Sequence, residues 1–187
     1  PYDGPPDRLL RNDGDADGDG VPTFTDVTEQ AGLGDTLWTF GVAVADYDND
    51  GDADIYLTNW GPTRLYRNDG DGRYTEIGGP AGIADDGWGV SAAWSDVEGD
   101  GDIEVISAAQ YDDKIAWYEN DGSQNFTEHV ISTTISGARS VFATDIDGDG
   151  DTDLLAASYN YATRKTVWYE NDGSQNFTEH VINTTYY

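Results

Sequence analysis

The stretch Asp46–Asp54 carries acidic side chains at a spacing that could surround one cation with oxygen atoms. The acids alternate along the stretch, and Gly51 stands among them. They are Asp46, Asp48, Asp50, Asp52 and Asp54. Ca²⁺ takes about six to eight oxygen ligands, and alternate side chains of a curled loop can point at one centre while the residue at position 7 offers its backbone carbonyl. Gly51 lacks the Cβ that would hinder the sharp turn, so the residues predict a calcium loop.

Apolar residues flank this loop at 40–45 and 55–57, so it is expected to join two strands. Asp and Gly are also common in hairpin turns, and a single loop leaves that interpretation open. Loops of the same kind begin at Asp96 and Asp145, at spacings of 50 and 49 residues. Three copies in phase favour calcium binding, with which a turn is compatible.

The whole chain follows a similar period. Trp117–Ile131 recurs letter for letter at Trp168–Ile182, and a fixed period of this length is typical of a propeller, a solenoid or an array. Each unit is expected to hold four short strands, as a propeller blade does. The predicted strands are 40–45, 55–58, 64–67 and 74–77 in the first unit, and 139–144, 154–158, 166–170 and 177–182 in the third.

The predicted fold is therefore all-β, with β-propeller-type blades of four antiparallel strands. Residues 1–34 are expected to form the last two strands of a partial blade with an acidic insertion, and whole blades are expected at 35–84, 85–135 and 136–187. Propellers close with about four to eight blades, so three and a half predict an incomplete propeller or one completed between chains. Asp26–Glu29 resembles a helix capping box, but Gly32 follows it, so about one helical turn is expected there.

The composition excludes several function classes. The net charge of -28 opposes binding to nucleic acid or to anionic membranes, and the sequence holds no apolar run of the roughly 20 residues that would insert into a membrane. The sequence has no Cys, hence no disulfide framework and no thiol chemistry. Because it begins with Pro1, we expect a processed chain or a piece of a longer one.

The stretch Phe40–Leu57 resembles an FG-GAP/VCBS repeat, the blade unit of integrin-α-like propellers. Residues 65–72 and 26–33 resemble the versions of this repeat in secreted bacterial proteins. The resemblance covers nearly the whole chain, and it implies that the Asp-x-Asp-x-Asp-Gly-x-x-Asp loop joins the first two strands of a blade and binds Ca²⁺. It also implies an extracellular or cell-surface location and a role in adhesion, binding or scaffolding.

Carrying the ligands of this family over by position implies three calcium sites. In each, four acids bind through their side chains and the residue at position 7 through its carbonyl. The sets are Asp46, Asp48, Asp50, Asp52 and Asp54; then Asp96, Glu98, Asp100, Asp102 and Glu104; and then Asp145, Asp147, Asp149, Asp151 and Asp153. The second set departs from the pattern, because its two glutamates are one methylene longer, and weaker binding is expected there.

Residues 15–26 leave two interpretations open. Acids at positions 1, 3, 5 and 12, with Gly20 at position 6, match the spacing of an EF-hand calcium loop. These acids are Asp15, Asp17, Asp19 and Asp26. No helices are predicted on either side, so the alternative is an elaborated hairpin turn without a metal. A fourth Ca²⁺ ion depends on the first interpretation.

Catalysis is not expected. His129 and His180 are the only histidines and stand at the same place in two repeats, which favours a structural role. No Ser stands beside a plausible base in a known motif, and a calcium ion inside a full oxygen shell leaves no open position for Lewis-acid chemistry. The protein is therefore predicted not to be an enzyme.

Two kinds of surface site remain candidates. Trp60 lies beside Gly61-Pro62 in an expected loop, where an exposed ring could stack on a sugar, although packing between blades is the more common use of such residues. Three sequons offer glycosylation acceptors if the protein is secreted into a glycosylating compartment. They are Asn125, Asn176 and Asn183.

The sequence thus predicts an extracellular, calcium-binding structural or adhesive repeat protein. The partial blade and the uncapped last blade predict self-association, head to tail into a surface filament, or continuation into neighbouring blades. One alternative is a carbohydrate-binding, lectin-like module with a glycan or protein ligand. The other is the non-catalytic propeller part of a larger secreted enzyme.

Overall fold

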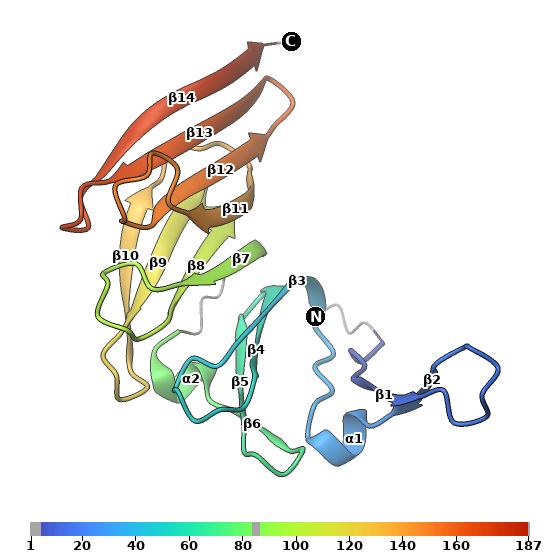
Figure 1. Ribbon diagram of the computed structural model, residues 1–187. Coiled ribbons are helices and arrows are strands. Elements are labelled where there is room, and N and C mark those ends of the chain that lie inside the picture. Colours follow the sequence, from blue (N-terminus) through green and yellow to red (C-terminus); the bar gives the residue numbers. More distant parts are fainter. Residues whose placement is uncertain (1–4, 84–86, 187) are drawn as a thin grey trace.

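The computed structural model describes residues 5–83 and 87–186 (Figure 1). Its strands form one two-stranded sheet and three four-stranded sheets. The two-stranded sheet holds β1 (Leu10–Gly14) and β2 (Thr23–Asp26). The first four-stranded sheet holds β3 (Trp38–Ala45), β4 (Asp54–Trp60), β5 (Arg64–Asn68) and β6 (Tyr74–Glu76). The second holds β7 (Gly89–Ser95), β8 (Glu104–Ala109), β9 (Lys114–Asn120) and β10 (Phe126–Ser132). The third holds β11 (Ala138–Thr144), β12 (Asp153–Tyr159), β13 (Thr163–Asn171) and β14 (Phe177–Tyr186).

Each four-stranded sheet is an antiparallel meander in which neighbours in the chain are neighbours in the sheet. The sheets follow one another in space in chain order, and their first strands β3, β7 and β11 are adjacent (Figure 1). This confirms the predicted all-β fold with four-stranded antiparallel blades. Within the described ranges the sheets do not close into a ring, which is consistent with an incomplete propeller. The predicted domain ranges stay predictions, and the boundary at 84/85 lies outside the described residues.

A bulge at the same place in each first strand allows these strands to approach closely. The register shifts at Thr39/Gly41 in β3, at Gly89/Ser91 in β7 and at Ala138/Ser140 in β11. A Cβ on Gly41 would lie 2.7 Å from Thr58 Oγ1 and 3.2 Å from the Val90 carbonyl oxygen. Glycine is therefore required where β3 passes β7.

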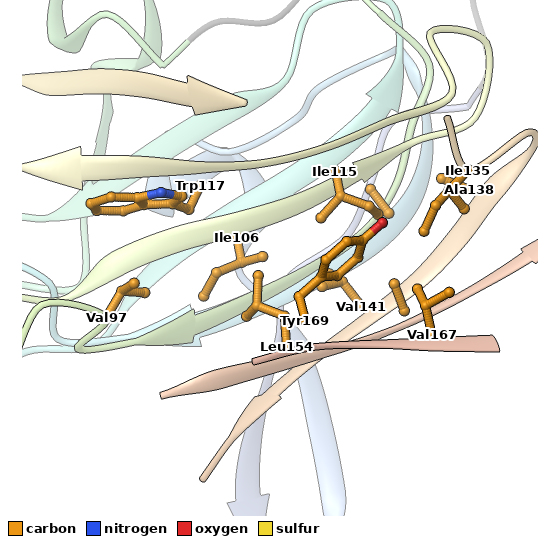
Figure 2. Packing of buried hydrophobic residues seen from close by; sticks show 12 residues of the cluster. Val97, Ile106, Ile115, Trp117, Ile135, Ala138, Val141, Leu154, Val167 and Tyr169 are labelled. Carbon is orange, nitrogen blue, oxygen red and sulfur yellow. The ribbon is translucent and has the colours of Figure 1, made fainter. Parts of the chain in front are cut away.

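The hydrophobic core lies between the sheets. One cluster fills the space between the second and third sheets, where Ile106 and Ile115 face Leu154 and Tyr169 (Figure 2). A second cluster, which includes Tyr47, Leu65 and Tyr118, fills the space between the first and second sheets. Burial of such side chains contributes about 1.5–3 kcal/mol each, so each sheet depends on its neighbour for stability.

Two single-turn helices follow the fourth-strand positions. α1 (Thr28–Ala31) lies where about one turn was expected, but Val27 is its N-cap and makes no side-chain cap, so the capping box does not form. Asp26 accepts from the Thr28 amide at 3.1 Å instead. The sequence did not predict α2 (Gly78–Ala81), because Gly and Pro are poor helix formers. The left-handed Gly82 ends it, and Ala81 and Ile83 anchor it in the core. Neither helix has the length and apolar character needed to cross a membrane.

Candidate metal centres

Four acidic loops lie at turns between strands. Three of them join the first two strands of a four-stranded sheet, at 46–53, 96–103 and 145–152, as the sequence predicted. The last acid of each set is the first residue of the following strand. The fourth loop, at 15–22, lies in the β1–β2 hairpin, which corresponds to the third and fourth strands of a blade.

The first acid of every loop organises the turn. Asp46 accepts backbone N–H groups from Asp50 at 3.0 Å and Gly51 at 2.9 Å. The first acids of the other loops accept from the glycines at positions 4 and 6, at 2.7–3.1 Å. These acids are Asp15, Asp96 and Asp145. The glycines at position 6 all have positive φ, from 87° at Gly20 to 101° at Gly150, so the turn needs them.

The structure brings three groups of acids together, with ligand atoms that all lie within 4.8 Å of one another. They are Asp46, Asp48 and Asp50; Asp145, Asp147 and Asp153; and Asp15, Asp17 and Asp19. Among the described residues, no such group includes an acid of the second loop. Its longer side chains, Glu98 and Glu104, are the departure that the sequence had shown. The remaining predicted ligands lie outside these groups, in the loops or in the strands that follow them. Metal binding by every one of the predicted ligands stays a prediction.

The last acid of each of the three loops is completely buried, which the sequence did not predict. Asp54 accepts from the backbone N–H of Tyr47 at 3.1 Å and of Asn68 at 2.7 Å. Asp153 accepts in the same way from Ile146 at 2.9 Å and Asn171 at 2.8 Å. The carboxylate therefore ties the loop to the end of the third strand.

Burial also changes the acidity of these groups. Burial raises the pKa of Asp54 to about 6, and nearby acids add to the effect. Burial raises the pKa of Glu104 to about 8, and the nearby acids Glu98, Asp96 and Asp100 add to the effect. Glu104 Oε2 accepts from Val97 N at 2.7 Å, whereas Oε1 is buried and has no hydrogen-bond partner. A nearby cation would hold both groups ionised.

Asp48, the second acid of the first loop, shows how the next sheet covers a loop. Gln124 of the β9–β10 turn donates from Nε2 to Asp48 Oδ2 at 3.0 Å. Asp48 Oδ1 is buried without a hydrogen-bond partner. Its pKa is raised, first by burial and then by Asp50 and Asp46. A buried carboxylate oxygen beside two further carboxylates fits a divalent cation and little else among common ligands.

Position 7 points its side chain away from the cluster. A Cβ on Gly70, Gly122 or Gly173 would lie 2.9, 2.6 or 2.5 Å from Oδ2 of the position-7 aspartate in the same sheet. These aspartates are Asp52, Asp102 and Asp151. The side chains rest on the Asn-Asp-Gly turns between the third and fourth strands, so any metal contact of these residues is left to their carbonyls, as the family pattern implies.

A repeated hydrogen bond between sheets was not predicted from the sequence. Asn120 Nδ2 donates to the carbonyl of Tyr47 at 3.1 Å, and Asn171 Nδ2 donates to the carbonyl of Val97 at 3.2 Å. Each amide reaches from an Asn-Asp-Gly turn to the second residue of the preceding sheet's acidic loop. The exact repetition of Trp117–Ile131 at Trp168–Ile182 was the signal that could have shown it.

Metal binding by the fourth loop and glycosylation of the sequons both remain predictions. Asp26, the proposed twelfth-position ligand, accepts from Thr28 Oγ1 at 2.6 Å and lies 3.6 Å from the guanidinium of Arg8. Its Thr28 hydrogen bond is the main reason that its pKa is lowered. The three sequon asparagines, Asn125, Asn176 and Asn183, are all exposed, so their glycosylation stays a prediction.

The histidines and Trp60 take part in packing. His129 stacks on Trp117 at 4.5 Å between ring centroids, and its Nε2 lies 2.6 Å from Glu119. His180 repeats this arrangement. Trp60 is the last residue of β4 and not a loop residue as expected, because it still pairs with Trp38 of β3. It is 43% exposed, but its ring stacks on Trp88 at 4.9 Å. Trp60 therefore packs between two sheets, which was the alternative to sugar binding that the sequence left open.

Comparison with known proteins agrees with the loop pattern. The family model for the FG-GAP-like repeat matches residues 46–107 and 96–156, so each match begins at the first acid of a loop. A search of curated proteins found no match to the chain.

Proposed function

The chain belongs to the family of FG-GAP-like repeats, and from this we propose that it is a calcium-stabilised structural or adhesive module that acts outside the cell or at its surface. Modules built from repeats of this family are often extracellular or adhesive. The contacts of the loops support calcium binding, and the exposed faces of the sheets support self-association.

The observation that carries the calcium proposal is the environment of Asp48. One of its oxygens is buried and unpaired, and two other acids of the same loop lie within 4.8 Å. An unpaired buried carboxylate oxygen is costly, and mutual repulsion of the acids adds to this cost. Bound Ca²⁺ would supply the positive charge that removes both costs. Extracellular modules bind calcium with a Kd of about 10⁻⁴–10⁻³ M, which suits partly exposed loops outside the cell.

The residues of the chain hold the loop ready for the ion. The first acid fixes the turn through backbone amides, and the buried last acid ties it to the third strand. The next sheet then covers it through Gln124 and Asn120. Calcium in this arrangement stabilises the contact between sheets. No catalytic step is assigned to the chain.

Thermal unfolding with and without calcium tests this proposal. For calcium at about 10–100 times Kd, each site contributes about 1.4–2.7 kcal/mol, and about 1 kcal/mol shifts Tm by 2–4 °C in a chain of this size. Three sites are therefore expected to raise Tm by about 10 °C or more over EDTA. Magnesium chloride at the same concentration controls for ionic strength. A melting curve that is the same in EDTA as in calcium would refute the proposal.

A matched pair of variants locates the effect. Asp48→Asn removes the charge of a clustered carboxylate, so it should lower the Tm gain from calcium. Asp71→Asn removes an exposed acid in the β5–β6 turn and should leave that gain unchanged. Equal calcium responses from the two variants would remove the first loop from the proposal.

Self-association is proposed from two uncovered sheet faces. On β3, Phe40, Val42 and Val44 are 46%, 64% and 58% exposed. The residues at the same places in the second sheet pack against the first sheet, and Ala92 and Trp94 belong to the cluster there. The opposite outer face carries an exposed Phe142, 60% exposed, on β11.

We expect the β3 face of one copy to pack on the β11 face of another, as the sheets do within one chain. Such a contact uses different faces of the two copies, and it produces a filament if it does not close into a ring. Light scattering at increasing concentration should show growth in mass. Val44→Asp should reduce that growth, and Val21→Asp, on the exposed β1–β2 loop, should not. A constant monomer mass for the parent protein would exclude self-association.

A further inference from the structure

A groove of about 450 Å³ lies between the second and third sheets, at the ends opposite the calcium loops. The loops of a meander alternate between its two ends, so the β8–β9 and β12–β13 loops meet here. Six of the residues that line the groove matter for its chemistry. They are Trp88, Gln110, Tyr111, Gly137, Tyr159 and Tyr161.

The corresponding place between the first and second sheets is filled by two indole rings. Trp60 of β4 stacks on Trp88 with ring centroids 4.9 Å apart and an angle of 11° between the planes. Gln110 stands at the place of Trp60, six residues after the buried acid of its sheet. Gly137 stands at the place of Trp88, eight residues before the first acid of its loop. The second interface therefore lacks both rings of this stack.

The missing ring at Gly137 is fixed by the backbone. A Cβ there would lie 2.3 Å from the carbonyl oxygen of Tyr159, and φ is +70°. The Gly137 amide donates to Asp113 Oδ1 at 2.6 Å, and its carbonyl accepts from Tyr159 N at 2.9 Å. No other residue fits this position without a backbone shift, so the hollow is part of the fold.

The groove retains aromatic walls. Tyr111 stacks on Trp88 at 5.3 Å and is 72% exposed, while Tyr161 is 95% exposed. Tyr159, whose ring contacts that of Tyr161, is held by two guanidinium groups, with Cζ of Arg139 and Arg164 at 5.4 and 4.9 Å from its ring centroid. The volume lies within the range of about 300–1,000 Å³ that is usual for small-ligand sites.

Two polar atoms at the groove lack partners. Gln110 Oε1 is buried and makes no hydrogen bond to any described residue, and the same holds for Trp88 Nε1. One is an acceptor and the other a donor. Leaving such a buried group unpaired costs about 1–3 kcal/mol. A ligand that can both donate and accept would recover this energy once the two side chains turn toward the groove.

We propose that the groove binds a pyranose ring of a neutral glycan. The apolar face of the sugar takes the place of the missing indole against the tyrosine walls, and its hydroxyl groups can pair with both Gln110 and Trp88. A tryptophan side chain of a peptide could donate to Gln110 but could not accept from Trp88. Anionic sugars are disfavoured by the net charge of -28. The site does not depend on the calcium proposal, because it lies at the other end of the sheets.

The test is binding of the whole chain, in millimolar calcium, to an array of neutral oligosaccharides built from glucose, mannose, galactose, xylose and N-acetylglucosamine. The sugar with the strongest signal is then titrated by calorimetry. Tyr161→Ala removes one exposed wall and should weaken binding by about 3- to 10-fold, the effect of a lost aromatic contact. Gln110→Trp should fill the hollow and abolish binding.

Tyr186→Ala is the matched control, because Tyr186 is an exposed tyrosine at 75% on β14 outside the groove, and binding should be unchanged. Melting curves establish that each variant is folded. The assignment is overturned if no neutral sugar binds, if binding survives Gln110→Trp in a folded protein, or if only a tryptophan-containing peptide binds.

Discussion

Replacement of Asn171 by alanine should destabilise the protein more than the same change at Asn68, although the two residues stand at the same place in the repeat. Asn171 is completely buried. Its Nδ2 donates to the carbonyls of Val97 and Thr152, both at 3.2 Å, and its Oδ1 accepts from Gly173 N and Gln175 N at 3.2 and 3.1 Å. The Val97 contact crosses to the second sheet.

Asn68 lacks that contact between sheets. Its Nδ2 donates to the Ala53 carbonyl at 3.1 Å and to Tyr74 Oη at 3.3 Å, and its Oδ1 accepts from Gly70 N at 3.1 Å. All these partners lie in its own sheet. Both alanine variants therefore lose the hydrogen bonds to the turn and to the carbonyl before β4 or β12. Only Asn171→Ala also leaves the buried Val97 carbonyl unpaired.

The expected difference follows from these contacts. An unpaired buried carbonyl costs about 1–3 kcal/mol, and the lost hydrogen bond to Gln175 N adds about 0.5–1.5 kcal/mol. The bond to Tyr74 that Asn68→Ala loses offsets the Gln175 bond, so Asn171→Ala should lower the free energy of unfolding by about 1–3 kcal/mol more than Asn68→Ala. Urea denaturation in calcium, followed by tryptophan fluorescence, measures both variants. A difference below about 0.5 kcal/mol, the usual scatter of independent sites, would refute the role assigned to this contact.

Two further predictions concern the loops themselves. Gly70 and Gly72 share a φ of +81°, but a Cβ on Gly70 would lie 2.9 Å from Asp52 Oδ2, whereas a Cβ on Gly72 would meet nothing within 4 Å. Gly70→Ala should therefore lower calcium affinity in a calorimetric titration. Equal affinities for Gly70→Ala and Gly72→Ala would contradict this. Because burial raises the pKa of Glu104 from 4.5 to about 8, the folded state binds this proton more tightly than the unfolded state. Without calcium, the contribution of Glu104 to stability should then be full below about pH 4.5 and fall as the pH rises to about 8. Glu104→Gln should reduce the loss of stability with rising pH, measured by urea denaturation in EDTA. Glu29→Gln, which changes an exposed residue, should not reduce it. Parallel pH profiles for the parent protein and Glu104→Gln would contradict this prediction.

The sequence could predict the features that depend on local spacing. The period of the acidic loops, the strands on either side of them and the Asn-Asp-Gly turns each depend on a few neighbouring residues, so the four-stranded sheets could be derived. The single turn at α1 could be derived for the same reason. The turn at α2 could not, because its residues are poor helix formers and its stability comes from the burial of Ala81 and Ile83.

Long-range contacts account for the rest. Asp54 was expected only as a ligand, and its bond to Asn68 N joins residues that no local rule connects. Gln124 and Asn120 looked like ordinary turn residues, yet they reach the loop of the preceding sheet. Trp60 was expected in a loop, but the structure places it at the end of β4, where Trp88 takes its ring face. Such contacts depend on how one sheet packs on the next, which the spacing along the chain does not specify.

The ties between sheets imply that calcium binding and packing of the sheets reinforce each other. The first and second loops are each covered by an asparagine from the next sheet, which holds Tyr47 and Val97 by their carbonyls. Ile146 occupies that place in the third loop and is 41% exposed. A second copy packed on the third sheet could supply this asparagine from its own turn. Under the proposed association, calcium at the third loop would favour the contact between copies, and the contact would raise calcium affinity by the same factor, because linked equilibria are reciprocal.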